Sequence, residues 1–222
     1  MKIPKFVALR RESGLKPVSG SGSRRKAFYM ARTKDFNEEE VLEKALNIFW
    51  QKGYSGTSMQ DLVDGLGISR SSMYDTYTDK YSLFIKSLER YREKTAGEMM
   101  QMINQSASPK AVIKKIFQSV VDESLFDKVQ RGCFMVNTCV ENSTHDKAVA
   151  KIVNENMQDV EEAFYHAIKK GQETGEITTR NDARALARFI INNINGIRIS
   201  AKAGADKKVY EDVMKVTLSV LE

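Results

Sequence analysis

Three hydrogen-bond donors, Arg70, Ser71 and Ser72, follow one another at the start of a predicted helix. A guanidinium group binds guanine or a phosphate through two parallel hydrogen bonds, and serines are small enough to let a helix approach closely. Because the first turn of such a helix meets base edges in the major groove, these side chains are candidates for DNA recognition. Ser69, directly before them, is a typical helix-capping residue.

The candidate residues belong to the second of two short helices predicted within residues 57–77. Thr57 or Ser58 can cap the first helix, and Gln60 stands three residues after Thr57, as a capping box requires. Gly67 can adopt the positive φ that ends this helix in a tight turn. A helix, a glycine turn and a capped helix form the helix-turn-helix pattern, although a helical corner without a DNA contact has the same pattern.

The residues after this stretch offer further contacts. Thr78 or Asp79 can cap a long helix with Lys80 in its first turn, and a helix N-terminus beside a lysine favours a phosphate. A solvated lysine is the alternative. Tyr74 can be a core residue or a phosphate contact, whereas the spacing of Tyr77 predicts that it faces inward.

With its flanks, this stretch resembles the N-terminal DNA-binding domain of the TetR family. Members have a first helix that ends in a Gly-aromatic pair, a threonine, the helix-turn-helix, and a Tyr-x-x-aromatic-x-x-Lys-x-x-Leu signature. The matching residues here are Gly53, Tyr54, Thr57, Tyr74, Tyr77, Lys80 and Leu83. The resemblance implies DNA contacts from Thr57, Ser69, Arg70, Ser71, Ser72, Tyr74, Tyr77 and Lys80. It is close over the helix-turn-helix and its flanks, and the rest fits only the general layout of the family.

The electrostatics of this stretch depart from what a DNA-binding surface needs. Members of the family often carry an aromatic residue and a histidine after the tyrosine, where this chain has Asp75 and Thr76. Four acidic residues stand against two basic ones between residues 57 and 82. We therefore expect binding to depend on amides and hydroxyls, with Lys52, Arg32 and Lys34 assisting.

Residues 1–29 differ in composition from the rest of the chain and are interpreted as a basic tail. Up to Phe36 there are ten Lys and Arg residues against two acidic ones, although the formal net charge of the whole chain is only +6. The tail can be a basic arm that adds phosphate contacts, or an expression leader that precedes a natural start at Met30.

The predicted fold is all-α. A three-helix helix-turn-helix domain is expected at residues 30–82, and a helical effector-binding and dimerisation domain at 83–222. The first helix is predicted to start at Asn37 and to end at Gly53. Further helices are predicted at about 79–104, 109–127, 131–141, 145–174, 182–203 and 206–221. No stretch predicts a membrane span or a secretory signal, so the cytoplasm is the expected location.

The helix predicted at 131–141 is nearly apolar all round and is expected to be buried. In the TetR family, the equivalent helix lines a ligand cavity. The candidate effector pocket consists of Phe117, Val121, Leu125, Phe134, Asn137, Thr138, Met157 and Tyr165. Ordinary core packing is the alternative for each of them.

The two cysteines and two histidines predict no metal site and no cofactor. Cys133 and Cys139 are six apart on one predicted helix, so they diverge, and we expect reduced thiols rather than a redox sensor. Neither His145 nor His166 has partners at ligand spacing. No nucleophile, base or metal constellation predicts an enzyme.

The last two predicted helices present more apolar surface than one small body readily covers, which favours a homodimer. The residues expected at its interface are Phe189, Asn193, Ile197, Val213, Val216 and Val220. Packing within a monomer is the alternative. Together, the patterns and the resemblance predict a homodimeric repressor that a small-molecule effector releases from palindromic double-stranded DNA. A helical protein-interaction module without DNA binding is the competing interpretation.

Overall fold

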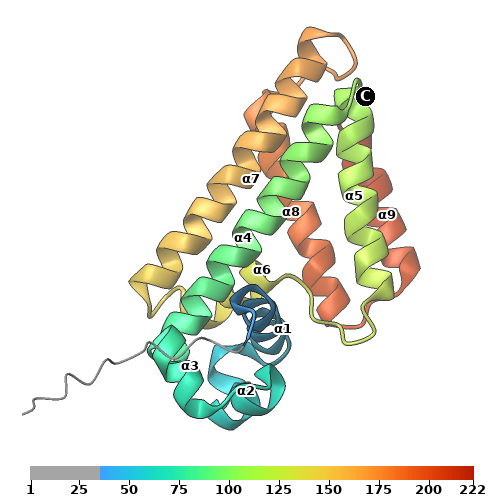
Figure 1. Cartoon of the computed structure of the whole chain (residues 1–222). Helices are drawn as coiled ribbons and strands as arrows, with labels where there is room; N and C mark the ends of the chain where they lie inside the picture. Colours follow the sequence, from blue (N-terminus) through green and yellow to red (C-terminus); the bar gives the residue numbers. More distant parts are fainter. Residues whose placement is uncertain (1–35) are drawn as a thin grey trace, which may run out of the picture. The chain divides into compact units, whose positions relative to one another are not determined.

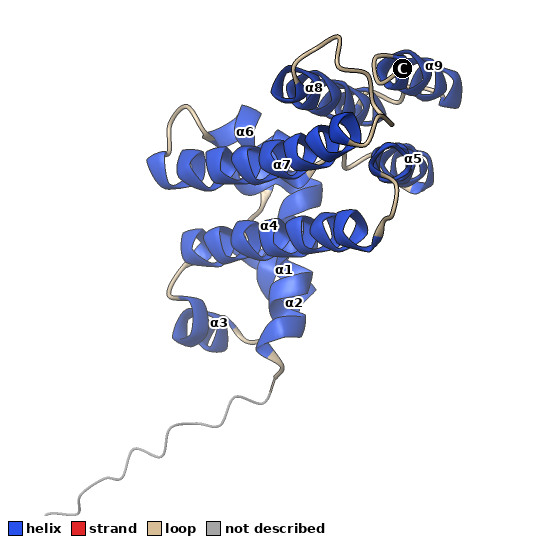
Figure 2. Ribbon diagram, turned by 90° about the horizontal axis from the view of Figure 1, so that it is seen from above, coloured by secondary structure: helices blue, strands red, loops and turns tan. Residues whose placement is uncertain are grey.

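The computed structural model describes residues 36–222, and the described part of the chain is helical, without strands (Figures 1 and 2). The helices are α1 (Glu38–Gly56), α2 (Met59–Leu66), α3 (Arg70–Tyr77), α4 (Lys80–Gln105), α5 (Pro109–Phe126), α6 (Phe134–Asn142), α7 (Lys147–Glu173), α8 (Ala183–Lys202) and α9 (Lys207–Ser219). The predicted all-α fold is confirmed. The predicted tail at 1–29, Met30, Arg32 and Lys34 lie outside the described residues.

The first helix begins and breaks at the predicted residues. The Asn37 side chain accepts hydrogen bonds from the amides of Glu39 and Glu40, so it caps α1. Helical turns continue to Gly56, but the backbone leaves helical geometry at Gly53, which has φ 73° and ψ 170°. A residue with a Cβ rarely adopts this conformation, so glycine is the residue that suits the break.

The caps of α2 and α3 set the angle of the helix-turn-helix. Ser58, not Thr57, caps α2, and the partner in its capping box is Asp61 rather than Gln60. Gly67 ends α2 with φ 69°, and the Ser69 side chain then caps α3. The predicted turn is therefore present, and of the two predicted caps, Thr57 and Ser58, it is Ser58 that caps α2.

The helix predicted from Arg131 begins only at Phe134. Gln130 and Gly132 both have positive φ, so the chain before Phe134 forms a loop. Phe134, Met135, Val136 and Thr138 are buried, but Val140 is 79% exposed. The helix is therefore buried on one side only, which corrects the expectation that it is enclosed all round.

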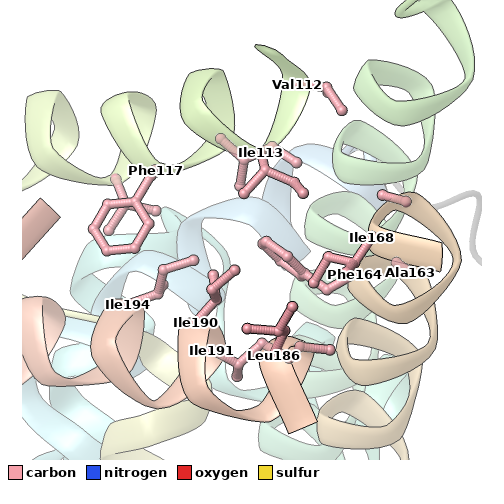
Figure 3. Packing of buried hydrophobic residues seen from close by; sticks show 14 of the residues in the cluster. Val112, Ile113, Phe117, Ala163, Phe164, Ile168, Leu186, Ile190, Ile191 and Ile194 are labelled. Carbon is pink, nitrogen blue, oxygen red and sulfur yellow. The ribbon is translucent and has the colours of Figure 1, made fainter. Parts of the chain in front are cut away.

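Two hydrophobic cores organise these helices. The first core joins α1, α2 and α3 to the first half of α4, to α6 and to the start of α7. The second core joins α5 to α8 and the remainder of α7, with contributions from α4 and α9. In Figure 3, Phe117 and Ile113 from α5, Phe164 from α7 and Ile190 from α8 point toward one another. The helices α4 and α7 therefore contribute to both cores.

Gly53 offers a test of the backbone break. A Cβ there would lie 2.7 Å from Glu141 Oε2, in addition to the strain of the positive φ. We expect Gly53→Ala to lower the free energy of unfolding by about 1–3 kcal/mol, measured by urea denaturation.

The matched control is Gly97→Ala, because Gly97 lies within α4 and a Cβ there would meet no atom within 4 Å. This substitution should raise the free energy of unfolding by about 0.5–1 kcal/mol. Equal effects of the two substitutions would contradict the role assigned to Gly53.

Candidate functional site

The outer face of α3 carries side chains that are free to meet a partner. Arg70 and Ser71 are exposed, and Tyr74 is 44% exposed. Among the described residues, Arg70 has no hydrogen-bond or ion-pair partner. A free guanidinium and a phenol one turn apart can therefore reach bases or phosphates without breaking an internal contact.

A cluster of hydroxyls surrounds the start of the same helix. Ser69 Oγ accepts a hydrogen bond from the Ser72 amide at 3.1 Å. It also lies 2.9 Å from both Ser71 Oγ and Ser72 Oγ. Ser69 therefore shapes the helix terminus, while Ser71 and Ser72 can turn their hydroxyls outward.

Two residues expected at the DNA are instead internal supports. Thr57 is 1% exposed, and its hydroxyl donates to the Gly53 carbonyl at 2.6 Å. Tyr77 is 3% exposed, and its hydroxyl donates to the Glu38 carbonyl at 3.2 Å. Their side chains are unavailable to DNA because the core and the backbone of α1 already occupy them, which corrects the predicted set.

The predicted phosphate clamp at the start of α4 is partly occupied from within. The Lys80 ammonium lies 4.3 Å from the centre of the Tyr54 ring, and Asp79 accepts a hydrogen bond from the Ser82 amide at 2.7 Å. This hydrogen bond lowers the pKa of the Asp79 carboxyl. Lys52, expected to assist, is paired with Asp61 at 2.5 Å. These lysines are engaged within the chain.

Two cavities lie behind the helix-turn-helix. One, of about 240 Å³, is bordered by α1, α4, α5, α6, α7 and α8, and the second, of about 470 Å³, lies under the loop between α5 and α6. They share the lining residues Trp50, Tyr91, Val120, Glu123 and Arg198. Taken together, the two volumes fall within the range of roughly 300–1,000 Å³ that is typical of small-molecule sites.

Polar groups gather where the two cavities meet. Arg198 donates to Cys133 Sγ at 3.7 Å, and the Tyr91 hydroxyl lies 3.5 Å from the same sulfur. Burial, followed by the neighbouring Cys133, raises the pKa of Tyr91 well above its ordinary value. Burial also raises the pKa of Glu123, although Arg198 acts in the opposite direction.

The structure changes most of the predicted pocket. Of the eight candidates, Met157 lines a cavity. Core packing occupies Phe117, Val121, Phe134 and Thr138, while Leu125 is 39% exposed. The Asn137 side chain donates to the Arg131 carbonyl, and Tyr165 lies under the guanidinium of Arg184 at 4.0 Å. These seven line neither of the two cavities, and their place in an effector site stays a prediction.

The loop before α6 holds the middle of α1. Trp50 Nε1 donates to the Gly132 carbonyl at 3.1 Å, and the Arg131 guanidinium lies 4.3 Å from the centre of the Trp50 ring. Arg131 also donates to the Asn47 side chain at 3.1 Å. Trp50, Arg131 and Gly132 also line the second cavity, so this cavity borders both α1 and the loop before α6.

The other end of α6 holds the end of α1. Glu141 accepts hydrogen bonds from the backbone amides of Tyr54 at 3.3 Å and Ser55 at 2.9 Å. Both amides follow the break at Gly53. The carboxylate therefore satisfies backbone donors that the interrupted helix leaves unpaired. We call the contacts of Arg131, Gly132 and Glu141 with α1 the α6 clamp.

The residues expected at a dimer interface divide between the surface and the core. Phe189 is 44% and Val216 is 65% exposed. Asn193, Val213 and Val220 are partly exposed, and the Asn193 amide donates to the Phe189 carbonyl. Ile197 is 1% exposed and packs in the second core, so its assignment to the interface is corrected.

Between residues 36 and 222, no helix is long and apolar enough to cross a membrane. Within the same range, no group of three or more His, Cys, Asp or Glu side chains is arranged to hold a metal ion.

Comparison with known proteins decides the family. Residues 41–86 match the family described as "Bacterial regulatory proteins, tetR family", and residues 109–217 match "Tetracyclin repressor-like, C-terminal domain". The uncharacterized HTH-type transcriptional regulator YezE of Bacillus subtilis is 34% identical over 194 residues, which cover 87% of this chain and 100% of that protein. The chain belongs to the TetR family.

Other relatives extend this result. The HTH-type transcriptional repressor ComR of Escherichia coli is 29% identical, over 84% of this TetR-family chain and 90% of its own length. A cysteine mutant of the regulator CifR, solved with 26 bp of operator DNA, has a similar fold. Its TM-score is 0.77 at 20% identity, with 86% of this chain and 100% of that chain covered. The family assignment makes this chain a transcriptional regulator.

Sequence reasoning missed the polar junction and the α6 clamp of this TetR-family chain. Arg198 stands between Ile197 and Ile199 on α8, and a single charge between two apolar residues is a usable signal. Glu141 closes a nearly apolar stretch and carries a similar signal. The partners of both residues are remote in sequence, so no local pattern indicates them.

The clamp predicts a local effect of Glu141→Gln. The substitution removes the charge and one of the two acceptor oxygens, so the Tyr54 and Ser55 amides should exchange with solvent about tenfold faster, as measured by hydrogen exchange. Glu89→Gln is the control, because Glu89 is exposed on α4. Unchanged exchange at both amides would show that Glu141 does not hold this backbone.

Proposed function

We propose that the protein is a repressor whose homodimer binds a palindromic operator and is released by a small-molecule effector. The observation that carries the proposal is the outer face of α3, where Arg70, Ser71 and Tyr74 are available in a chain of this family. Operator DNA bound to the similar CifR structure supports the same use of this fold. We place operator binding in residues 30–82, and effector binding and dimerisation in residues 83–222.

In this proposal, the base contacts come from Arg70 and Ser71, with Ser72 beside them. Tyr74 binds a phosphate, while Ser69 caps the helix that carries them. The buried Tyr77 holds α3 against α1, the buried Thr57 bonds back to the Gly53 carbonyl of α1, and neither side chain touches DNA. Acidic residues outnumber basic ones between residues 57 and 82, so positioned hydroxyls and amides supply a large share of the phosphate contacts.

The proposed dimer interface consists of neighbouring faces of α8 and α9. Val209, Val213, Val216 and Val220 recur at spacings of four, three and four, so they share one face of α9 and its C-terminal end. Phe189 and Asn193 supply the neighbouring face of α8. A two-fold dimer built on this interface presents two α3 helices to two half-sites, which a palindrome requires.

The effector is proposed to act through the α6 clamp. Cys133, Met135 and Val136 of the loop and helix line the smaller cavity, and Arg131 and Gly132 line the larger one. A ligand that moves this segment changes its contacts with Trp50 and, through Glu141, with the end of α1. The ligand shifts the operator-binding equilibrium only if it binds one arrangement of α6 more tightly than the other.

The proposal places the protein in the cytoplasm, where operator DNA is found, and assigns it no enzymatic reaction. A helical interaction module without DNA binding is the competing function, and its signature would be the absence of salt-dependent binding to the operator duplex.

Arg70→Ala is expected to weaken binding to the inverted repeat upstream of the gene, found by footprinting, by about tenfold or more. Fluorescence anisotropy over a series of salt concentrations measures the effect. If Arg70 contacts a base, the preference for the operator over a scrambled duplex falls. If it contacts a phosphate, both duplexes weaken and the salt slope decreases by about one.

Arg180→Ala is the matched control, because Arg180 is exposed in the loop between α7 and α8, away from α3. Operator affinity should be unchanged. A loss as large as that of Arg70→Ala would remove α3 as the origin of the effect.

Val216→Asp is expected to convert the dimer into a monomer, because a buried unpaired carboxylate strongly opposes association. Light scattering after gel filtration should give twice the mass of one chain for the unchanged protein and one chain for the variant. Lys215→Asp, a change of an exposed neighbour on α9, should remain dimeric. A dimeric Val216→Asp protein would place the interface elsewhere.

A further inference from the structure

The effector cavities contain one charge that cannot be relieved within the chain. Arg198 is partly buried, and among the described residues its side chain donates a hydrogen bond only to the Cys133 thiol, with no carboxylate within ion-pair distance. A guanidinium has five donors and cannot lose its proton in a protein. A buried guanidinium that faces a cavity without an anionic partner is therefore suited to bind one from outside.

The other charged side chains around the smaller cavity have an ion-pair partner, are exposed to solvent, or can become neutral by taking up a proton. Lys94 and Glu43 pair at 3.0 Å, and Glu98 is exposed to solvent. Glu123 can take up a proton, because burial raises the pKa of its carboxyl even though Arg198 lowers it. Arg198 alone has none of these routes, so an anion gains more from this cavity than a cation does.

The residues around Arg198 indicate that the ligand also has an apolar part. Ile191, Ile194, Asn195 and Arg198 follow helical spacing on α8, and all four line the smaller cavity. Apolar side chains from α4, α5 and α7 complete that cavity: Met99, Met102, Ile116, Val160 and Phe164. A ligand with its charge at Arg198 therefore has an apolar space beside it.

A second polar group in the same cavity also lacks a partner. Asn156 is 8% exposed and lines the smaller cavity from α7, and its side chain forms no hydrogen bond with any described residue. An amide buried to this degree is normally hydrogen-bonded. A ligand with a polar head that exposes several acceptor oxygens can satisfy such an amide.

We propose that the effector is a small carboxylic acid with an apolar body, and that its carboxylate binds Arg198 at the junction of the two cavities. The proposal rests on the effector-responsive function proposed above and specifies the chemical class of the effector. Glu123 lines both cavities and acts on Arg198 without forming an ion pair with it, so the bound acid competes with this carboxylate for the guanidinium.

Three probes with the same eight-carbon body and different heads test the class: octanoate, octanamide and octylamine. Trp50 is the single tryptophan of the chain and lines both cavities, so its fluorescence reports occupancy directly. Titrations of the full chain, at concentrations below micelle formation, should give a dissociation constant for octanoate at least tenfold lower than for octanamide. Octylamine should bind more weakly still.

Variants of the two charged residues should change this ranking. Arg198→Met should remove the difference between octanoate and octanamide while octanamide still binds. Glu123→Gln should strengthen octanoate binding severalfold, because it removes the competing carboxylate, and it keeps the proposal testable if Arg198→Met does not fold. Arg188→Met is the matched control on α8, because Arg188 is exposed, pairs with Glu161 and lines neither cavity.

The proposal is overturned if octanamide or octylamine binds as tightly as octanoate, if none of the three probes binds, or if Glu123→Gln weakens octanoate. Operator binding is measured separately. If octanoate occupies the site as expected but leaves operator affinity unchanged, the carboxylate site stands and the effector part of the proposed function fails. If the operator is not bound at all, the proposed function fails irrespective of the ligand.

Discussion

The arrangement of this molecule depends on the burial of α6 against α1 and α4. An aromatic cluster makes this contact: the Phe134 ring lies 5.6 Å from the Tyr91 ring and 6.1 Å from the Phe84 ring, and Tyr91 lies 5.3 Å from Trp50. Edge-to-face rings at such distances add attraction to the burial of apolar surface. The helices α1 and α4, which share the first core with α2 and α3, are therefore packed against α6, and α6 borders the smaller cavity.

The helix caps and the turn were predictable from the sequence. The environment that each apolar helix face contacts was not. Asn37, Gly67 and Ser69 act within a few residues of themselves, so their types and spacing predict their roles. Phe117 and Ile197 show the limit of this reasoning. Each lies on an apolar stripe, and an apolar stripe can face a core, a cavity or a partner chain with the same spacing. Only the packing of several helices distinguishes these environments.

The charge distribution separates what positions α3 from what contacts a partner. Asp61 completes the capping box of α2 and Asp79 caps α4, so their negative charges support the fold although they oppose the approach of a polyanion. Lys52 and Lys80 are engaged by neighbours within the chain. Arg70 is left as the cation with most freedom to meet a ligand, which concentrates recognition in the first turn of α3.

The long helix α4 has a mechanical consequence. It contains 26 residues, and as a continuous helix it spans about 39 Å. A rotation of about 3° around one end would displace the other end by about 2 Å over this length. In a symmetric pair the two displacements oppose each other across the axis, so the gap between half-sites would change by about twice that amount. Small shifts in side-chain packing are thereby amplified to a size that a fixed DNA repeat of about 34 Å does not tolerate.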